Sequence, residues 1–336
     1  MLGDEDDWRE VGKALVARAE ASGDPSGAAT AAFELVRRLA LVADPAVGTW
    51  ANRAAALAAA ADAPAFVAGC TVLQGVLRVQ TGSIRAGLQR IDSALHAVEV
   101  PEIAAIGLMA RVQALAALGE STEEALAALE ALSDRADWMF GAAWALEQRG
   151  DDAWRAEDWE ASAGWLERAL RLFESHGMRR ADQIRARLAV LDHHFQRTHR
   201  AAARFEQCLA ALPGDQRPQW RAYVLEGRGD LRRDRGDLLG AAEDWTSAAR
   251  WWDRHGDVRH ARHCRDLALE ARTVLPAMRR VRPVTRGGKS AVRTMLRWIS
   301  RTILRRPTPA PPTLSPSLLA VVGASASERQ AAHDRP

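Results

Sequence analysis

Lysine is nearly absent from this chain, in which Lys13 and Lys289 are the only lysines among 46 basic residues. Tyrosine occurs once, phenylalanine six times, and runs of Val, Ile and Thr are scarce. Because β-branched and aromatic residues favour strands, their shortage argues against a β-rich fold. Apolar residues make up 48% of the chain, and Ala dominates them, which together with Leu and Arg favours helices. We therefore predict an all-α fold, and we attribute the excess of Ala and Arg to a high-GC bacterial coding bias.

Cysteine is also scarce, and its three copies, Cys70, Cys208 and Cys264, lie far apart in the sequence. An odd, sparse set of cysteines in a helical chain indicates reduced thiols. The acidic start of the sequence lacks the apolar core of a secretory signal. No stretch reaches the ~18 uninterrupted apolar residues of a typical spanning helix. These features predict a cytoplasmic protein.

Charge is distributed unevenly along the chain, whose formal net charge is +3. Residues 271–336 carry 13 basic and two acidic residues, a net charge of +11, which leaves −8 on the first 270 residues. The chain therefore combines an acidic body with a basic tail, and we expect the two parts to have different roles.

A set of four positions, at offsets of 0, 12, 16 and 19 residues, recurs along the chain. The side chains at these positions are in turn small, small, large, and small or medium. Successive copies start 38, 37, 39 and 40 residues apart. A period in this range is typical of a stack of helix pairs. The copies are Gly75, Gly87, Ile91, Ala94; Gln113, Ala125, Leu129, Leu132; Gly150, Ser162, Leu166, Ala169; Ala189, Ala201, Phe205, Cys208; and Gly229, Ala241, Trp245, Ala248.

The regions around this array differ from it in sequence. Three N-terminal helices are expected over 5–21, 27–42 and 46–61, and the first two match the interval pattern weakly through Ala17 and Ala29. A terminal helix over 257–275 is expected to close the stack, with Val258 among its inward residues. We divide the chain into N-terminal helices, possible members of a divergent repeat (1–67), a solenoid with its capping helix (68–275), a basic segment (276–306), and a Pro-rich, disordered tail (307–336).

The array resembles the tetratricopeptide repeat family over roughly residues 68–253. That family's unit is nominally ~34 residues and consists of two antiparallel helices with small residues where they cross. The likeness is best in 143–174, through Leu146 and Gly150, and in 222–253, through Leu225 and Gly229. The resemblance implies an α-solenoid of about five to six repeats.

The family commonly binds peptides or partner proteins on a concave face lined by the first helix of each pair. Chaperone-binding members carry a Lys/Asn clamp there, which this chain lacks, so we do not expect a chaperone-tail site. Aromatic residues beside charges instead suit a peptide or an amphipathic helix. The alternative for Trp144 and Trp154 is that they only pack between units. The resemblance places these residues on the face: Trp144, Glu147, Asp151, Trp154, Arg155, Gln183, Arg187, His193, His194, Tyr223, Glu226, Asp230 and Arg233.

Several motifs that could indicate other chemistry have simpler explanations. His255, His260, His263 and Cys264 include metal-ligand types, but the surrounding arginines disfavour a cation. Three Arg-Gly-Asp triplets fall on repeat positions. The phosphate-loop-like run at 287–290 lacks its first Gly and a preceding strand. No nucleophile–base–acid set is visible, so we predict no enzymatic activity, no cofactor, no metal and no small-molecule substrate.

A candidate helix over 289–306 is strongly amphipathic. Basic residues recur every four positions on one face, with Val292, Leu296 and Ile299 opposite them and Trp298 at a flank. Such a helix suits an anionic membrane surface, here the inner membrane face. It could equally dock on an acidic solenoid, whereas non-specific nucleic-acid contact is less favoured. Its proposed contact residues are Lys289, Arg293, Arg297, Trp298, Arg301 and Arg305.

Together these features predict a non-catalytic scaffold or adaptor that binds a peptide or helix of a partner protein on the concave face, with the basic tail tethering or gating it. One alternative is a membrane-surface adaptor that uses the amphipathic helix. Another is a regulatory subunit that contacts nucleic acid.

Overall fold

The computed structural model describes residues 7–41, 46–136, 138–178, 180–212 and 218–280. Across these ranges the chain forms fourteen α-helices, one short 3₁₀ helix and no strand, which confirms the all-α prediction. The helices belong to two compact units, and the boundary between the units falls between Arg149 and Gly150, inside α8.

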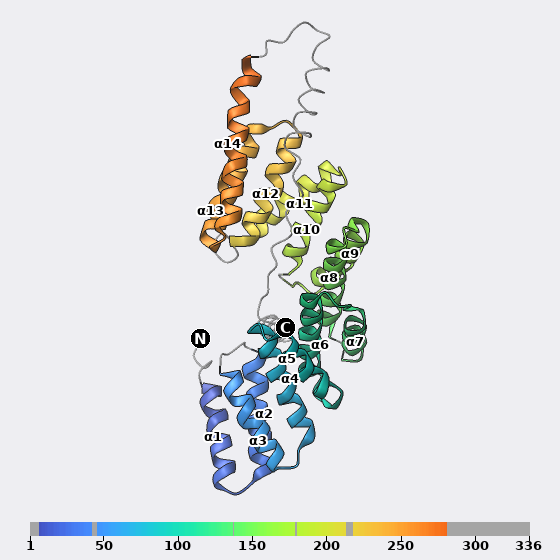
Figure 1. The fold of residues 1–336 in the computed structure, drawn as a ribbon, viewed down its shortest axis with the longest axis vertical. Helices are drawn as coiled ribbons and strands as arrows, with labels where there is room; N and C mark the ends of the chain where they lie inside the picture. Colours follow the sequence, from blue (N-terminus) through green and yellow to red (C-terminus); the bar gives the residue numbers. More distant parts are fainter. Residues whose placement is uncertain (1–6, 42–45, 137, 179, 213–217, 281–336) are drawn as a thin grey trace, which may run out of the picture. The chain divides into compact units, whose positions relative to one another are not determined.

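The first unit contains the N-terminal helices and the first two copies of the recurring pattern. Successive helices pack against each other, and α2, α4 and α6 also contact one another in turn. Figure 1 shows these helices side by side, coloured from blue to teal. They are α1 (Asp7–Ala21), α2 (Pro25–Leu41), α3 (Val47–Ala60), α4 (Pro64–Gln80), α5 (Ile84–Ala94), the 3₁₀ helix η1 (Leu95–Ala97), α6 (Pro101–Leu118), α7 (Glu123–Arg135) and α8 (Met139–Arg155), whose last turns lie in the second unit.

The second unit continues the same alternation. Helix α12 packs on α11, α13 and α10, and α13 packs on α14. Alternate helices therefore form a row of first helices, α10 and α12, against which the second helices pack (Figure 1). The unit comprises α9 (Trp159–Ser175), α10 (Ala181–His194), α11 (Thr198–Ala211), α12 (Pro218–Asp234), α13 (Leu238–His255) and α14 (Val258–Arg280).

The small residues of the recurring pattern lie where the paired helices cross. A Cβ on Gly75 would lie 2.9 Å from the Gly87 carbonyl oxygen. In another pair, the Ser162 hydroxyl donates a 2.8 Å hydrogen bond to the Gly150 carbonyl oxygen. Helices approach this closely only where side chains are small. The intervals thus record real helix crossings, and the predicted solenoid architecture is confirmed.

Local signals start and stop the helices as the sequence suggests. Proline occupies the first turn of α4 and α6, where no helical hydrogen bond is lost. The Asp158 and Asp237 side chains cap α9 and α13 by accepting hydrogen bonds from backbone N–H groups. Gly119 ends α6 in the left-handed conformation, with φ of +73°.

The first and last helices differ from the sequence prediction. Val11 and Leu15 share a face of α1, but 49% and 53% of their surfaces are exposed, because α2 is the main helix that packs on α1 among the described elements. Ala17 is also exposed, although it matches the weak interval pattern. Val258 was expected to point inward, but it is 70% exposed at the start of α14. Periodicity identifies an apolar face without showing whether another helix covers it.

Helix α6 is the one described helix that is long and apolar enough, by length and composition, to cross a membrane. More than half of it is buried by its neighbours in the unit, as expected for a core helix of a stack.

Candidate functional site

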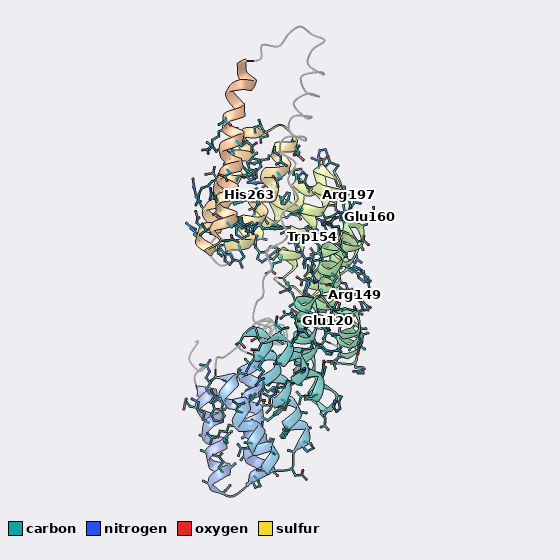
Figure 2. All side chains as sticks on the ribbon, in the orientation of Figure 1. Glu120, Arg149, Trp154, Glu160, Arg197 and His263 are labelled. Carbon is teal, nitrogen blue, oxygen red and sulfur yellow. The ribbon has the colours of Figure 1, made fainter. Side chains whose placement is uncertain are left out.

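The predicted partner-binding residues all lie on the first helices of the pairs. Trp144 and Glu147 belong to the part of α8 in the first unit, and the remainder belong to the second unit. We call the side of α8, α10 and α12 that carries these residues the first-helix face. Figure 2 labels Trp154 at the C-terminal end of α8.

Several residues of the first-helix face are buried. The exposed fraction is 2% for Trp144, 7% for Trp154 and 1% for Tyr223, and Glu147 and Arg187 are buried as well. Trp154 meets Trp159 edge-to-face, with 5.1 Å between ring centroids. The burial of both indoles fits the alternative that these tryptophans pack between helices.

Asp151, Arg187 and Tyr223 come from three consecutive first helices and lie close together. The Arg187 guanidinium is buried and forms an ion pair with the Asp151 carboxylate. The same guanidinium partly offsets the effect of burial, which raises the pKa of the Tyr223 hydroxyl above its usual range. The structure thus brings together three side chains that the family resemblance placed on one face.

His193 at the C-terminal end of α10 and Arg233 at the C-terminal end of α12 both pair with Asp234. Arg233 also pairs with Asp230. His193 Nε2 lies 3.2 Å from Asp234 Oδ2, and Arg233 Nε lies 3.2 Å from Asp234 Oδ1. Arg233 Nη1 also lies 3.3 Å from Asp230 Oδ1. All four side chains are partly exposed, so this cluster is one accessible part of the first-helix face.

The two aspartates respond differently to this environment. Burial raises the pKa of Asp230, and the Arg233 and His193 charges offset this only in part. Burial also acts on Asp234, but the hydrogen bond with His193 and the Arg233 charge outweigh it and lower the pKa of that carboxyl. Asp234 was missing from the predicted site. Its position one residue after Arg233 could have indicated it, because it also adjoins the face.

Glu226 lies on α12 between Tyr223 and Asp230 and is 1% exposed. Its Oε2 accepts a 3.1 Å hydrogen bond from the Trp252 indole Nε1, whereas Oε1 has no hydrogen-bond partner within the described ranges. Burial, followed by the nearby Asp230 charge, raises the pKa of Glu226 to about 7. Trp252, His260 and the Cys264 thiol act in the opposite direction.

The His and Cys residues at the end of the array have local partners. His260 Nδ1 lies 2.7 Å from Asp257 Oδ2, and its ring lies over Trp252 with 4.8 Å between centroids. Burial raises the pKa of the Cys264 thiol. The thiols of Cys70, Cys208 and Cys264 are all free of disulfide bonds. In the part of the chain that the structure describes, no group of three or more His, Cys, Asp or Glu side chains is arranged to hold a metal ion.

The predicted tail contacts lie outside the described residues, so their role remains a prediction. They are Lys289, Arg293, Arg297, Trp298, Arg301 and Arg305.

Comparison with solved structures bears on the architecture. The apo form of RapI matches with a TM-score of 0.50 at 12% identity, covering 78% of this chain and 80% of that one. The helix crossings at the recurring small residues agree with this likeness. The fold is tetratricopeptide-like.

Two further solved structures match this tetratricopeptide-like chain with TM-scores of 0.40. BtubC (BKLC) from P. vanneervenii is 18% identical, with 81% of this chain and 95% of that chain covered. A tetratricopeptide repeat protein from Parabacteroides merdae is 15% identical, with coverages of 78% and 98%. No protein-family model and no curated protein matches the chain. At these identities the likeness concerns the fold alone.

Proposed function

We propose that this protein is a non-catalytic interaction scaffold that binds a peptide or helix of a partner protein on the first-helix face of its second unit. The observation that carries the proposal is the partly exposed cluster of His193, Asp230, Arg233 and Asp234 beside buried Tyr223 and Glu226. Mixed charges next to aromatic side chains suit recognition of a polypeptide.

The solenoid architecture supports the same proposal. Stacked helix pairs present an extended row of side chains from successive first helices, and such rows are suited to holding an extended or helical segment. The sequence contains no recognisable nucleophile–base–acid set, and for that reason we propose binding rather than catalysis. A cytoplasmic location remains a prediction from the sparse cysteine content.

Affinity capture with the full chain tests the face. We expect the double variant His193→Gln/Arg233→Gln to lose partners that the unchanged protein retains, because these side chains present its accessible charges. Substituting the buried tryptophans would be less informative, since a lost core indole costs about 3–5 kcal/mol of folding free energy and affects binding indirectly.

A matched control separates a specific face from general surface charge. His199→Gln/Arg262→Gln removes one exposed histidine and one exposed arginine from other positions of the second unit. The control should keep the same partners. Identical partner lists for both double variants and the unchanged protein would contradict the assignment of this face.

A further inference from the structure

Three carboxyl side chains are buried in the described part of the second unit, and two of them have arginine partners. Asp192 lies 2.8 Å from Arg204, and Asp244 lies 2.7 Å from Arg228. The third, Glu226, forms no ion pair within the described residues, and the groups that hydrogen-bond its carboxyl, the Trp252 indole and the Cys264 thiol, are neutral. A buried carboxylate without a countercharge is costly, so this site differs from the chain's usual arrangement.

A second unpartnered polar atom lies one helical turn away on the same side of α12. The Tyr223 hydroxyl is buried and, among the residues that the structure describes, it has no hydrogen-bond partner. The same holds for Glu226 Oε1. Native proteins rarely leave two such atoms so close together, and a bound ligand is one of the standard explanations. The two oxygens can both accept hydrogen bonds, so a donor-rich group fits them.

The surroundings of these atoms are aromatic, and one ring among them, that of His260 on α14, is partly exposed. Trp220 meets the Tyr223 ring edge-to-face, with 5.7 Å between centroids, and the His260 ring lies over Trp252. His260 has 37% of its side chain exposed, and on the other side Asp230 is also partly exposed. The groups that face Glu226 are therefore Asp230 of its own helix, Trp252 of α13, and His260 and Cys264 of α14.

We propose that Glu226 and Tyr223 form a receptor for a basic side chain, arginine or lysine, of the peptide partner. The inference deepens the proposed function and rests on it. The guest would supply the countercharge that Asp192 and Asp244 obtain from the chain's own arginines. Its N–H groups would donate to Glu226 Oε1 and the Tyr223 hydroxyl, and the neighbouring aromatic rings favour a cation.

Proton release provides a specific signature of this site. Burial holds the pKa of Glu226 at about 7 in the free protein, so close to half of these carboxyls carry a proton at neutral pH. A cation beside the carboxylate lowers that pKa. Binding at pH 7 should therefore release a fraction of a proton, of the order of one half.

The probe is N-acetyl-arginine methylamide, compared with its neutral analogue N-acetyl-citrulline methylamide. Titration of the full chain is followed by the ¹⁵N shift of the Trp252 indole, and proton release is measured by calorimetry in two buffers of different ionisation enthalpy. We expect the arginine compound to shift the indole signal and release protons, and the citrulline compound to do neither.

Variants assign the effect to the two residues. Glu226→Gln keeps the shape of the side chain and should weaken arginine binding by about tenfold or more and abolish proton release. Tyr223→Phe should weaken binding severalfold but retain the release. Glu160→Gln, which alters an exposed glutamate in the same unit, should change neither. Circular dichroism checks that each variant is folded.

The receptor proposal is overturned by any of three results. The citrulline compound binds as well as the arginine compound, Glu226→Gln binds the arginine compound as tightly as the unchanged protein does, or binding of the arginine compound releases no proton. These outcomes are separate from those of affinity capture. Partners lost by His193→Gln/Arg233→Gln but retained by Glu226→Gln would keep the scaffold function and remove the receptor. A positive arginine titration without any captured partner would remove the scaffold function alone.

Discussion

At the scale of single residues, glycine and small side chains determine where the helices can cross. Gly229 faces the indole of Trp245, and a Cβ there would lie 2.6 Å from Trp245 Nε1. Trp245 is buried, so it cannot move aside into solvent. The large side chain at offset 16 therefore requires the small one at offset 0.

Replacing this glycine should destabilise the second unit. We expect Gly229→Ala to lower the free energy of unfolding by about 2 kcal/mol, because the added methyl group overpacks the crossing. Gly164→Ala is the matched control, since it lies on an exposed part of α9 with no atom within 4 Å of the added Cβ. The free energy of unfolding of the control should rise by up to about 1 kcal/mol, because alanine has a higher helix propensity than glycine. Urea unfolding measures both, and equal effects would contradict the crossing argument.

Glu226 should make stability depend on pH in an unusual direction. Its pKa is about 7 in the folded protein, above the ordinary value of 4.5, so the folded state holds this proton more tightly than the unfolded state. The contribution of the protonated Glu226 carboxyl to the free energy of unfolding is fully present below about pH 4.5. It is lost as the pH rises through 7, which lowers the free energy of unfolding by roughly 3 kcal/mol.

The measurement is urea unfolding at pH 5 and pH 8 for the unchanged protein and for Glu226→Gln. The variant cannot ionise, so its stability should fall less over this interval, and the difference between the two proteins isolates the carboxyl. The same fall in both proteins would show that Glu226 does not titrate in this range.

At the scale of elements, each second helix of the best repeats starts with an aspartate cap. Asp237 accepts a 3.0 Å hydrogen bond from the Gly240 backbone N–H, and Asp158 does the same for Ala161. The Arg-Gly-Asp triplet at 235–237 is therefore explained by a turn glycine followed by a helix cap. Gly236 has φ of +85°, a conformation that favours glycine.

Removing the cap should weaken α13 measurably. Asp237→Ala is expected to cost about 1 kcal/mol of folding free energy, because a backbone donor in the first turn loses its partner. Asp237→Ser, which can still cap, should recover most of that loss in the same thermal or urea unfolding measurement. Equal stabilities for the Ala and Ser variants would argue that the cap contributes nothing.

Ion pairs also join elements across the helix pairs. Arg149, labelled in Figure 2, lies at the end of the first unit and pairs with Glu130 of α7 at 3.1 Å. In the second unit, Arg228 of α12 bridges Glu206 of α11 and Asp244 of α13. Arginine suits these positions because its planar guanidinium can bind two carboxylates at once.

At the scale of the whole molecule, the chain consists of two units, and within each unit the described helices contact mainly their neighbours in sequence. Stability in such arrays is close to a sum of local terms, so damage in one place spreads only over a limited distance. The division into two compact units suggests where this spread should stop.

Hydrogen exchange followed by mass spectrometry tests this locality. We expect Gly229→Ala to speed exchange in α12 and α13 and to leave α4 and α5 unchanged. Gly75→Ala, which would place a Cβ 2.9 Å from the Gly87 carbonyl oxygen, should show the reverse pattern. A uniform loss of protection over both units in either variant would indicate that the array unfolds as one cooperative body.

The sequence by itself determined the fold class, the positions of the helix crossings and most turns. This was possible because a helix crossing needs a small residue at a fixed interval from a large one, and that constraint is local in sequence. Gly150 with Ser162, and Gly229 with Trp245, show the pattern directly. The resemblance to tetratricopeptide repeats also placed Tyr223, Arg187 and Asp151 on one face.

Only the tertiary structure decided which of these side chains are accessible and which polar atoms have partners. Val11 and Leu15 have the periodicity of a buried face but remain exposed, since α2 is the main described helix that packs on α1 and it leaves them uncovered. Glu226 has the sequence context of an ordinary surface glutamate, yet Trp252 and α14 enclose it, 26 or more residues away in the sequence. Burial and the balance of charges depend on such distant neighbours, so a pattern within one helix cannot predict them.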